Sequence, residues 1–187
     1  MQETERFLAR AKELHGDVCF GLALGVRLSL AGMRSLGLSP AERNRRLIAF
    51  VEVDRCMTDA VQAVTGCSLG HRNLKYVDYG KFACVLLDTA SGRAVRVSTR
   101  DFSPKDNSDT IGHLMTAPED ELLKLEEVDV RVNEDDMPGK PKNRAFCAKC
   151  GERILDNRGV RKGDKLLCRA CANGAYYRVL PGPNLKE

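Results

Sequence analysis

The sequence predicts an α+β core domain, built on a mixed sheet of four to five strands flanked by helices, and a small cysteine-rich unit after it. Three observations support this fold class. Helix-like and strand-like apolar patterns are interspersed over the first part of the chain, a charged stretch with two prolines follows, and two Cys-x-x-Cys pairs come last. We therefore expect an α+β core domain at residues 1–132, a linker at 133–143 and a four-cysteine domain at 144–187.

Apolar spacing and end signals predict the helices of the core domain. The second helix is apolar nearly all round and should be central, and Gly21 and Gly25 leave a strip on it where another backbone can approach closely. Asp17 is placed to cap its N-terminus. The predicted helices are residues 3–14, residues 18–36, one beginning at Ser39-Pro40-Ala41-Glu42, residues 57–65, and a short one from a capping box of Thr116 and Glu119 to Leu123.

Short apolar runs between turn residues predict the strands. Ser91 and Gly92 lie between two such runs, which is typical of a β-hairpin. The predicted strands are residues 47–53, 81–87, 93–99 and 127–132. Because helices precede and separate the strands, we expect one mixed sheet with helices packed against it.

Composition and charge distinguish the two parts of the chain. Of the 187 residues 43% are hydrophobic, which is enough for a core, whereas 5% are aromatic and none is Trp. So few aromatic residues argue against a groove that stacks single-stranded nucleic acid. Residues 140–187 carry twelve Lys and Arg against four Asp and Glu, whereas residues 1–139 carry eighteen against twenty-two. The C-terminal part is therefore basic and the N-terminal part acidic.

The N-terminal residues and the cysteine content indicate a cytoplasmic protein. The first residues have neither the basic start nor the apolar run of a secretory signal. The longest apolar stretch, Val18 to Gly37, is interrupted by Arg27 and Arg34, so a buried helix explains it better than a membrane span. Eight cysteines in such a chain indicate metal or redox chemistry. We expect no membrane partner.

Four cysteines form the most specific motif. Cys147-Ala148-Lys149-Cys150 and Cys168-Arg169-Ala170-Cys171 are separated by seventeen residues, and two such pairs complete a closed tetrahedral zinc site. Gly151 suits a tight turn after the first pair, and a hairpin followed by a helix at Ala170–Tyr177 would make a treble clef. The alternative is a redox dithiol, but so small a segment has too little core to fold without a staple. We therefore expect one structural zinc ion.

A second group of residues, in the N-terminal part, is compatible with a soft metal site. His15 and Cys19 lie four residues apart across a predicted helix start, and Cys56 lies where a strand leads into a helix. Free N–H groups at a helix N-terminus favour a thiolate, which binds a thiophilic ion or attacks a substrate. The alternative is that these cysteines simply fill core space, since free Cys is among the most buried residue types.

Three further residues of the N-terminal part have a structural interpretation, and two of them also have a functional one. Cys84 lies in a fully apolar strand and is expected in the core. Cys67 fits either the core or the site. Lys81, at a strand start, is either an ordinary solvated lysine or a cation that faces the site.

Taken together, three segments resemble the FmdE family of formylmethanofuran dehydrogenase subunits over essentially the whole chain. The segments are His15-Gly16-Asp17-x-Cys19-x-Gly21, then Arg55-Cys56-x-x-Asp59-Ala60-x-Gln62-x-x-Thr65-Gly66-Cys67-x-x-Gly70, then Gly80-Lys81-x-Ala83. The four-cysteine module is similar to the finger that some members carry.

The resemblance implies a site, an assembly and a metabolic setting. It implies a metal or catalytic site at His15, Cys19 and Cys56, with Cys67, Asp59 and Lys81 nearby. Members tend to form homodimers, and those of methanogens are associated with the molybdenum enzyme that makes formylmethanofuran from carbon dioxide.

This chain departs from the family pattern at one place. Relatives commonly read His-Gly-His-x-Cys-Pro-Gly, whereas this chain has Asp17 and Phe20. If the missing histidine contributes to metal affinity, the N-terminal site is weak or empty as purified.

Three functions compete at this point. The first is a metal- or thiol-dependent accessory of molybdenum- or tungsten-dependent one-carbon redox metabolism, itself catalytic or docked to the oxidoreductase. The second is a non-catalytic adaptor that docks a partner protein through its finger. The third is nucleic-acid binding by the basic finger, against which stands the lack of a recognition-helix pattern and of aromatic platforms.

Overall fold

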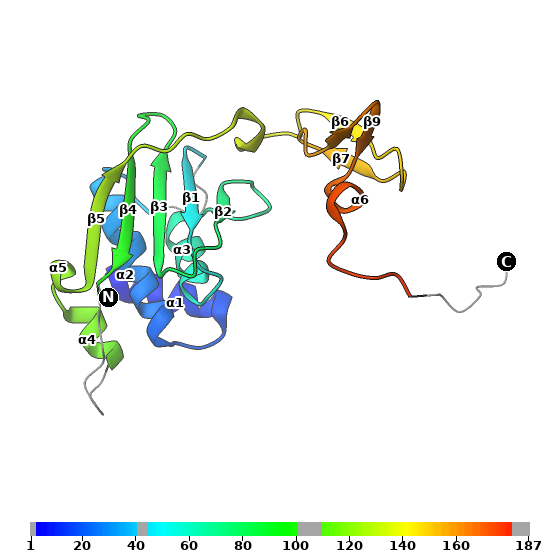
Figure 1. Ribbon diagram of the computed structural model, residues 1–187. Helices are drawn as coiled ribbons and strands as arrows, with labels where there is room; N and C mark the ends of the chain where they lie inside the picture. The colour runs from blue at the N-terminus through cyan, green and yellow to red at the C-terminus, as the bar shows by residue number, and fades with distance from the viewer. Residues whose placement is uncertain (1–2, 41–44, 101–109, 181–187) are drawn as a thin grey trace. The chain divides into compact units, whose positions relative to one another are not determined.

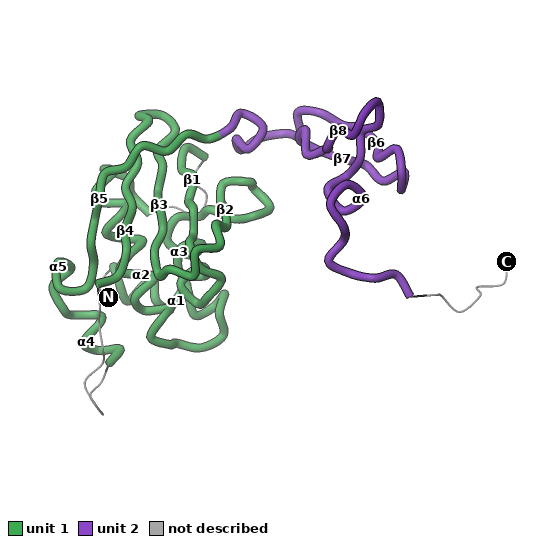
Figure 2. Tube along the Cα trace, viewed as in Figure 1, with its two compact units in different colours: residues 1–132 green, residues 133–187 purple. Residues whose placement is uncertain are grey.

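The computed structural model describes residues 3–40, 45–100 and 110–180 (Figure 1). The chain divides into two compact units, residues 1–132 and residues 133–187 (Figure 2). The predicted helix that begins at Ser39 and Pro40 continues into residues 41–44, which lie outside the described residues. That the two units fold independently stays a prediction.

Helices and one five-stranded mixed sheet form the core of the first unit, so the predicted α+β class is confirmed. The strand order is β2-β1-β3-β4-β5, in which β1 and β2 run parallel and the other neighbours are antiparallel. The strands are β1 Leu47–Val51, β2 Leu74–Tyr76, β3 Ala83–Asp88, β4 Ala94–Thr99 and β5 Leu123–Val128. The helices are α1 Glu3–His15, α2 Phe20–Ser35, α3 Met57–Thr65, α4 Thr110–Thr116 and α5 Glu119–Leu122.

Helix α2 lies at the centre of this unit, as its sequence predicts. Twelve of its sixteen residues are buried, and α1, α3, α4 and the sheet pack around it (Figure 1). Arg27, which interrupts its apolar run, is itself buried and donates to the carbonyl oxygens of Leu114 and Ala117. The guanidinium therefore satisfies backbone groups at the C-terminal end of α4. Among the described residues no helix is long and apolar enough to span a membrane.

The sequence-based prediction was wrong at one edge of the sheet. The last strand is β5, which pairs with β4 from Leu123 to Val128 rather than beginning at Glu127. The predicted capping box does not form, because Thr116 ends α4 and its hydroxyl donates to the carbonyl of Gly112 at 2.9 Å. Pro118 is the N-cap of α5 instead. Strand β2 and helix α4 were not predicted, since each is short and only its packing against neighbours stabilises it.

The second unit is small and loop-rich. Two two-stranded sheets, β6-β7 and β8-β9, precede a short helix. Its elements are η1 Glu134–Asp136, β6 Arg144–Phe146, β7 Arg153–Leu155, β8 Val160–Lys162, β9 Lys165–Leu167 and α6 Arg169–Asn173. The predicted helix at Ala170–Tyr177 is thus shorter and begins one residue earlier. The segment predicted as a linker, residues 133–143, belongs to this compact unit, and Asn157 donates to Asp135 at 2.9 Å.

Candidate metal centres

Three helix ends bring His15, Cys19 and Cys56 together. His15 is the last residue of α1, Cys19 is the N-cap of α2, and Cys56 is the N-cap of α3. One ligand atom from each lies within 4.8 Å of the other two, and all three residues are half-buried. Helix ends from separate parts of the sequence therefore form one cluster, which we call the N-terminal cluster.

The Cys19 sulfur is held by its own helix. Its Sγ accepts a hydrogen bond from the backbone N–H of Leu22 at 3.4 Å, so this thiol and not the predicted Asp17 caps α2. The same Sγ lies 3.9 Å from Nε2 of His15. Cys19 therefore lies at the N-terminus of α2, next to the positive end of the helix dipole. This is the position that the sequence predicted for Cys19.

Cys56 differs from Cys19 in its surroundings. Its side chain makes no capping hydrogen bond at α3. A hydrogen bond with Cys19, burial, and the negative charges of Cys19 and Asp17 raise the pKa of the Cys56 thiol above its ordinary value. The helix N-terminus alone therefore does not favour a Cys56 thiolate, and a metal ion bound here would have to displace its proton.

Close packing of α2 on α3 places the two thiols side by side. A methyl group added at Gly25 would lie 2.8 Å from Cβ of Ala60 and 2.9 Å from Cα of Met57, so only glycine allows this approach. A methyl group at Gly21 would lie 3.3 Å from Cβ of Cys56. The strip of glycines predicted on α2 is thus where α3 contacts it.

Asp59 is the neighbour predicted from the sequence that contacts the cluster directly. Its Oδ2 lies 2.8 Å from Nδ1 of His15. Gln62, one turn further along α3, donates to the other carboxylate oxygen at 3.2 Å. The Asp17 side chain is 82% exposed, and its Oδ1 lies 3.8 Å from Nε2 of His15.

Of the other residues singled out in the sequence, Cys67 and Lys81 were expected near the cluster and Cys84 in the core. Cys67 follows the opposite end of α3, is buried, and donates its S–H to the carbonyl of Leu47; burial raises its pKa to about 11. Cys84 is fully buried in β3, and burial raises its pKa strongly. Lys81 is exposed, and its ammonium lies 5.7 Å from the centre of the Tyr79 ring. The structure therefore does not bring Cys67 to the cluster, and it places Cys84 in the core as predicted.

The four cysteines of the second unit also converge. One sulfur from each of Cys147, Cys150, Cys168 and Cys171 lies within 4.8 Å of the others. In each pair a backbone N–H donates to the first sulfur: that of Lys149, two residues on, to Cys147 Sγ at 3.5 Å, and that of Cys171, three residues on, to Cys168 Sγ at 3.4 Å.

The convergence of four sulfurs forms a donor set that fits a cation. Backbone N–H groups of Cys150 and Cys168 lower the pKa of Cys147 to about 6, whereas the hydrogen bond with Cys168 raises the pKa of Cys171 to about 12. Four sulfurs so close together cannot all ionise without a positive ion between them. Four thiolate ligands in a tetrahedral set suit zinc.

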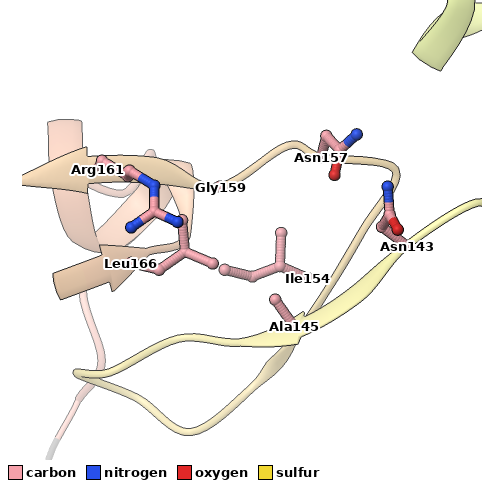
Figure 3. A pocket seen from close by; sticks show the side chains of 7 residues that line it. All are labelled: Asn143, Ala145, Ile154, Asn157, Gly159, Arg161 and Leu166. Atoms are coloured by element: carbon pink, nitrogen blue, oxygen red, sulfur yellow. The ribbon is translucent and has the colours of Figure 1, made fainter.

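A pocket of about 340 Å³ lies between the two hairpins of the second unit (Figure 3). Ile154 and Leu166 point toward each other across its floor, the Arg161 guanidinium lies beside Leu166, and two amides lie at the far end (Figure 3). Its lining is Asn143, Ala145, Ile154, Asn157, Gly159, Arg161 and Leu166. The lining has an apolar floor, one positive charge and no acidic residue.

Fold and sites together define a two-unit metal-binding protein with a C-terminal zinc finger. Residues 14–135 match the family described as "FmdE, Molybdenum formylmethanofuran dehydrogenase operon", and residues 142–177 match the "Prokaryotic dksA/traR C4-type zinc finger". The chain belongs to the FmdE family, and the resemblance read from its motifs is confirmed.

Two similar proteins extend this comparison. A protein of Archaeoglobus fulgidus described as "Probable S-adenosyl-L-methionine-binding protein" is 34% identical over 204 residues, which cover 94% of this chain and 54% of that protein. The chain thus spans about half the length of this curated relative. A crystal structure from Syntrophus aciditrophicus, of a protein described as "tungsten formylmethanofuran dehydrogenase subunit e (fmde)-like", shares the fold, with a TM-score of 0.66 at 23% identity over 94% of this chain and 95% of that one.

Proposed function

We propose that the N-terminal cluster binds a second metal ion, zinc first of all, through Nε2 of His15 and the sulfurs of Cys19 and Cys56. The observation that supports this most directly is the convergence of these three atoms within 4.8 Å. One imidazole and two thiolates form a soft ligand set that suits thiophilic ions. Three protein ligands are also the number that leaves zinc one open position, as in catalytic sites.

The residues of the cluster would have different roles at such a metal centre. The ion would supply Lewis acidity at its open position. Cys19 and Cys56 give up their protons when it binds, so binding strengthens as pH rises. His15 contributes the nitrogen that is turned away from Asp59. Half-burial of all three limits water at the centre while leaving a path to it.

The family gives the metabolic setting of the proposal. We infer that the chain acts in molybdenum- or tungsten-dependent one-carbon redox metabolism in the cytoplasm, as a homodimer and in association with the oxidoreductase. Its support is the match of residues 14–135 to a family described by the formylmethanofuran dehydrogenase operon. S-adenosyl-L-methionine is the first small molecule to test at the open position, because the Archaeoglobus relative is described as binding it.

Metal counting tests the proposal. Wild-type protein purified in zinc-supplemented buffer should carry two zinc ions per chain by plasma mass spectrometry. The Cys56→Ser variant should carry one, and the Cys168→Ser variant should lose the other. A wild-type protein with one ion per chain, and a Cys56→Ser variant with the same content, would rule out the N-terminal metal.

A second function is supported by the pocket of the finger. We propose that it docks an acidic peptide segment of a partner protein, with an aliphatic side chain on the apolar floor and a carboxylate at Arg161. Charge complementarity supports this occupant, because the lining holds Arg161 and no acidic residue, and residues 140–187 are strongly basic. Leu166 and Ile154 offer an aliphatic surface and no aromatic platform for a base.

A labelled peptide with one Leu between Asp and Glu residues tests this docking against single-stranded DNA of equal charge. The peptide should bind the full chain, and Arg161→Glu should abolish binding, whereas Arg178→Glu, an exposed position of the same basic unit outside the pocket lining, should not. Tighter binding of the oligonucleotide, with equal losses in both variants, would indicate nonspecific attraction to the basic surface.

A further inference from the structure

His15 lies between two carboxylates that differ in geometry. Asp59 Oδ2 is 2.8 Å from Nδ1, within hydrogen-bond distance, and its carboxylate is 34% exposed. Asp17 Oδ1 is 3.8 Å from Nε2, beyond hydrogen-bond distance, and its carboxylate is 82% exposed. The two carboxylates carry the same charge, but only that of Asp59 is hydrogen-bonded to the imidazole ring.

An ionised carboxylate only accepts hydrogen bonds, so the bond to Asp59 requires the proton on Nδ1 of His15. In the neutral ring the other nitrogen, Nε2, then carries a free lone pair. Nε2 is also the nitrogen that faces Cys19 Sγ, at 3.9 Å. The tautomer that Asp59 selects is therefore the one in which the lone pair points into the cluster.

The Asp59 carboxylate is itself held in place. Gln62 Nε2 donates to Oδ1 at 3.2 Å, which leaves Oδ2 for the imidazole. Asp59 and Gln62 lie three residues apart on α3, one turn of the same helix, and α3 also carries Cys56 at its N-cap. One helix thus holds a thiol of the cluster and the pair that orients the imidazole.

We propose that Asp59, held by Gln62, is a positioning residue that fixes the tautomer and orientation of His15 so that Nε2 faces Cys19 and Cys56. Its value for metal binding rests on the proposed function of the cluster. Carboxylates that orient ligating histidines typically change metal affinity about 10- to 100-fold. The Asp59 backbone N–H donates to the Cys56 carbonyl within α3, but among the described side-chain hydrogen bonds its carboxylate contacts His15 and neither thiol, so the carboxylate acts through the imidazole ring.

Nitrogen NMR of the imidazoles in metal-free, full-length protein tests the tautomer, with His15→Asn to assign the signal. The His15 signal should report the Nδ1–H tautomer in wild type and in Asp17→Ala, and a mixture in Asp59→Ala. An Nε2–H tautomer in wild type, or an unchanged signal in Asp59→Ala, would overturn the proposal. This readout does not depend on whether the cluster holds a metal.

Cobalt(II) titration of protein reconstituted with one equivalent of zinc, which the closed four-thiolate site of the finger takes up first, then tests the consequence. Cobalt binds less tightly than zinc and does not displace it from the finger, so visible absorption reports the N-terminal cluster. Asp59→Ala should weaken cobalt binding about 10- to 100-fold, far more than Asp17→Ala, and Gln62→Ala should weaken it in the same direction. An equal loss of cobalt affinity in Asp59→Ala and Asp17→Ala would show that only the negative charge matters. That result would overturn the proposal that Asp59 positions His15. If wild type binds no cobalt, the proposed metal site is refuted instead. The NMR measurement of the His15 tautomer would still test whether Asp59 positions the imidazole.

Discussion

The Gly25→Ala substitution probes how the contact between α2 and α3 assembles the N-terminal cluster. The new methyl group would lie 2.8 Å from Cβ of Ala60 and 2.9 Å from Cα of Met57. Non-bonded carbons prefer about 3.5–4.0 Å, so the helices must separate by roughly 0.6 Å or more. The Met57 atom belongs to the backbone and cannot rotate away.

The magnitude follows from two opposing effects. Overpacking a core costs about 1–3 kcal/mol, and a contact with backbone belongs to the upper half of that range. Replacing glycine by alanine inside a helix returns about 1 kcal/mol. We therefore expect Gly25→Ala to lower the free energy of unfolding of the core by about 1–2 kcal/mol. Because Cys56 precedes Met57, the same separation should also weaken metal binding by the cluster.

Gly32→Ala is the matched control on the same helix. Its methyl group would lie 2.8 Å from Cδ1 of Leu86, the tip of a side chain that can rotate, and far along α2 from Cys19. Urea unfolding followed by circular dichroism measures both variants, and cobalt absorption measures the cluster. If Gly25→Ala is as stable as wild type and binds cobalt equally well, the argument that this contact positions the cluster is wrong.

Three further predictions concern the finger, the thiols and the two units. Chelation of zinc, or Cys168→Ser, should remove amide protection from the second unit and leave the first intact, since binding and folding are coupled at such sites; unchanged hydrogen exchange would contradict this. Alkylation at pH 8 with mass mapping should modify Cys56, which is half-buried, but spare Cys67 and Cys84, which are buried and inaccessible to the reagent, although the pKa of all three thiols is raised, and zinc should protect Cys56; equal inertness of all three would show that Cys56 is an ordinary core residue. Cleavage within residues 133–143 should leave a folded N-terminal fragment, and its aggregation would show that the units depend on each other.

Sequence patterns predicted the elements that carry a strong local signal, such as a long apolar helix or a pair of closely spaced cysteines. The apolar residues of α2 are buried on nearly every side, so the helix was recognisable without its neighbours. The two Cys-x-x-Cys pairs specify a metal site by spacing alone, and the structure brings their sulfurs together. Strand β2 and helix α4 escaped prediction, because three and seven residues carry too weak a periodic signal.

The composition of the N-terminal cluster could be predicted from the sequence only in part. The sequence by itself determined that a His and two Cys lie at predicted helix ends, and the family motif grouped them. Only the tertiary structure decided that Cys56 meets Cys19 while Cys67 lies past the other end of α3, because the glycine contact between α2 and α3 sets which helix ends adjoin. It also decided that Asp59 bonds to His15 and that Cys19 rather than Asp17 caps α2. Such contacts join residues from separate segments, and no local pattern along the chain encodes the distance between them.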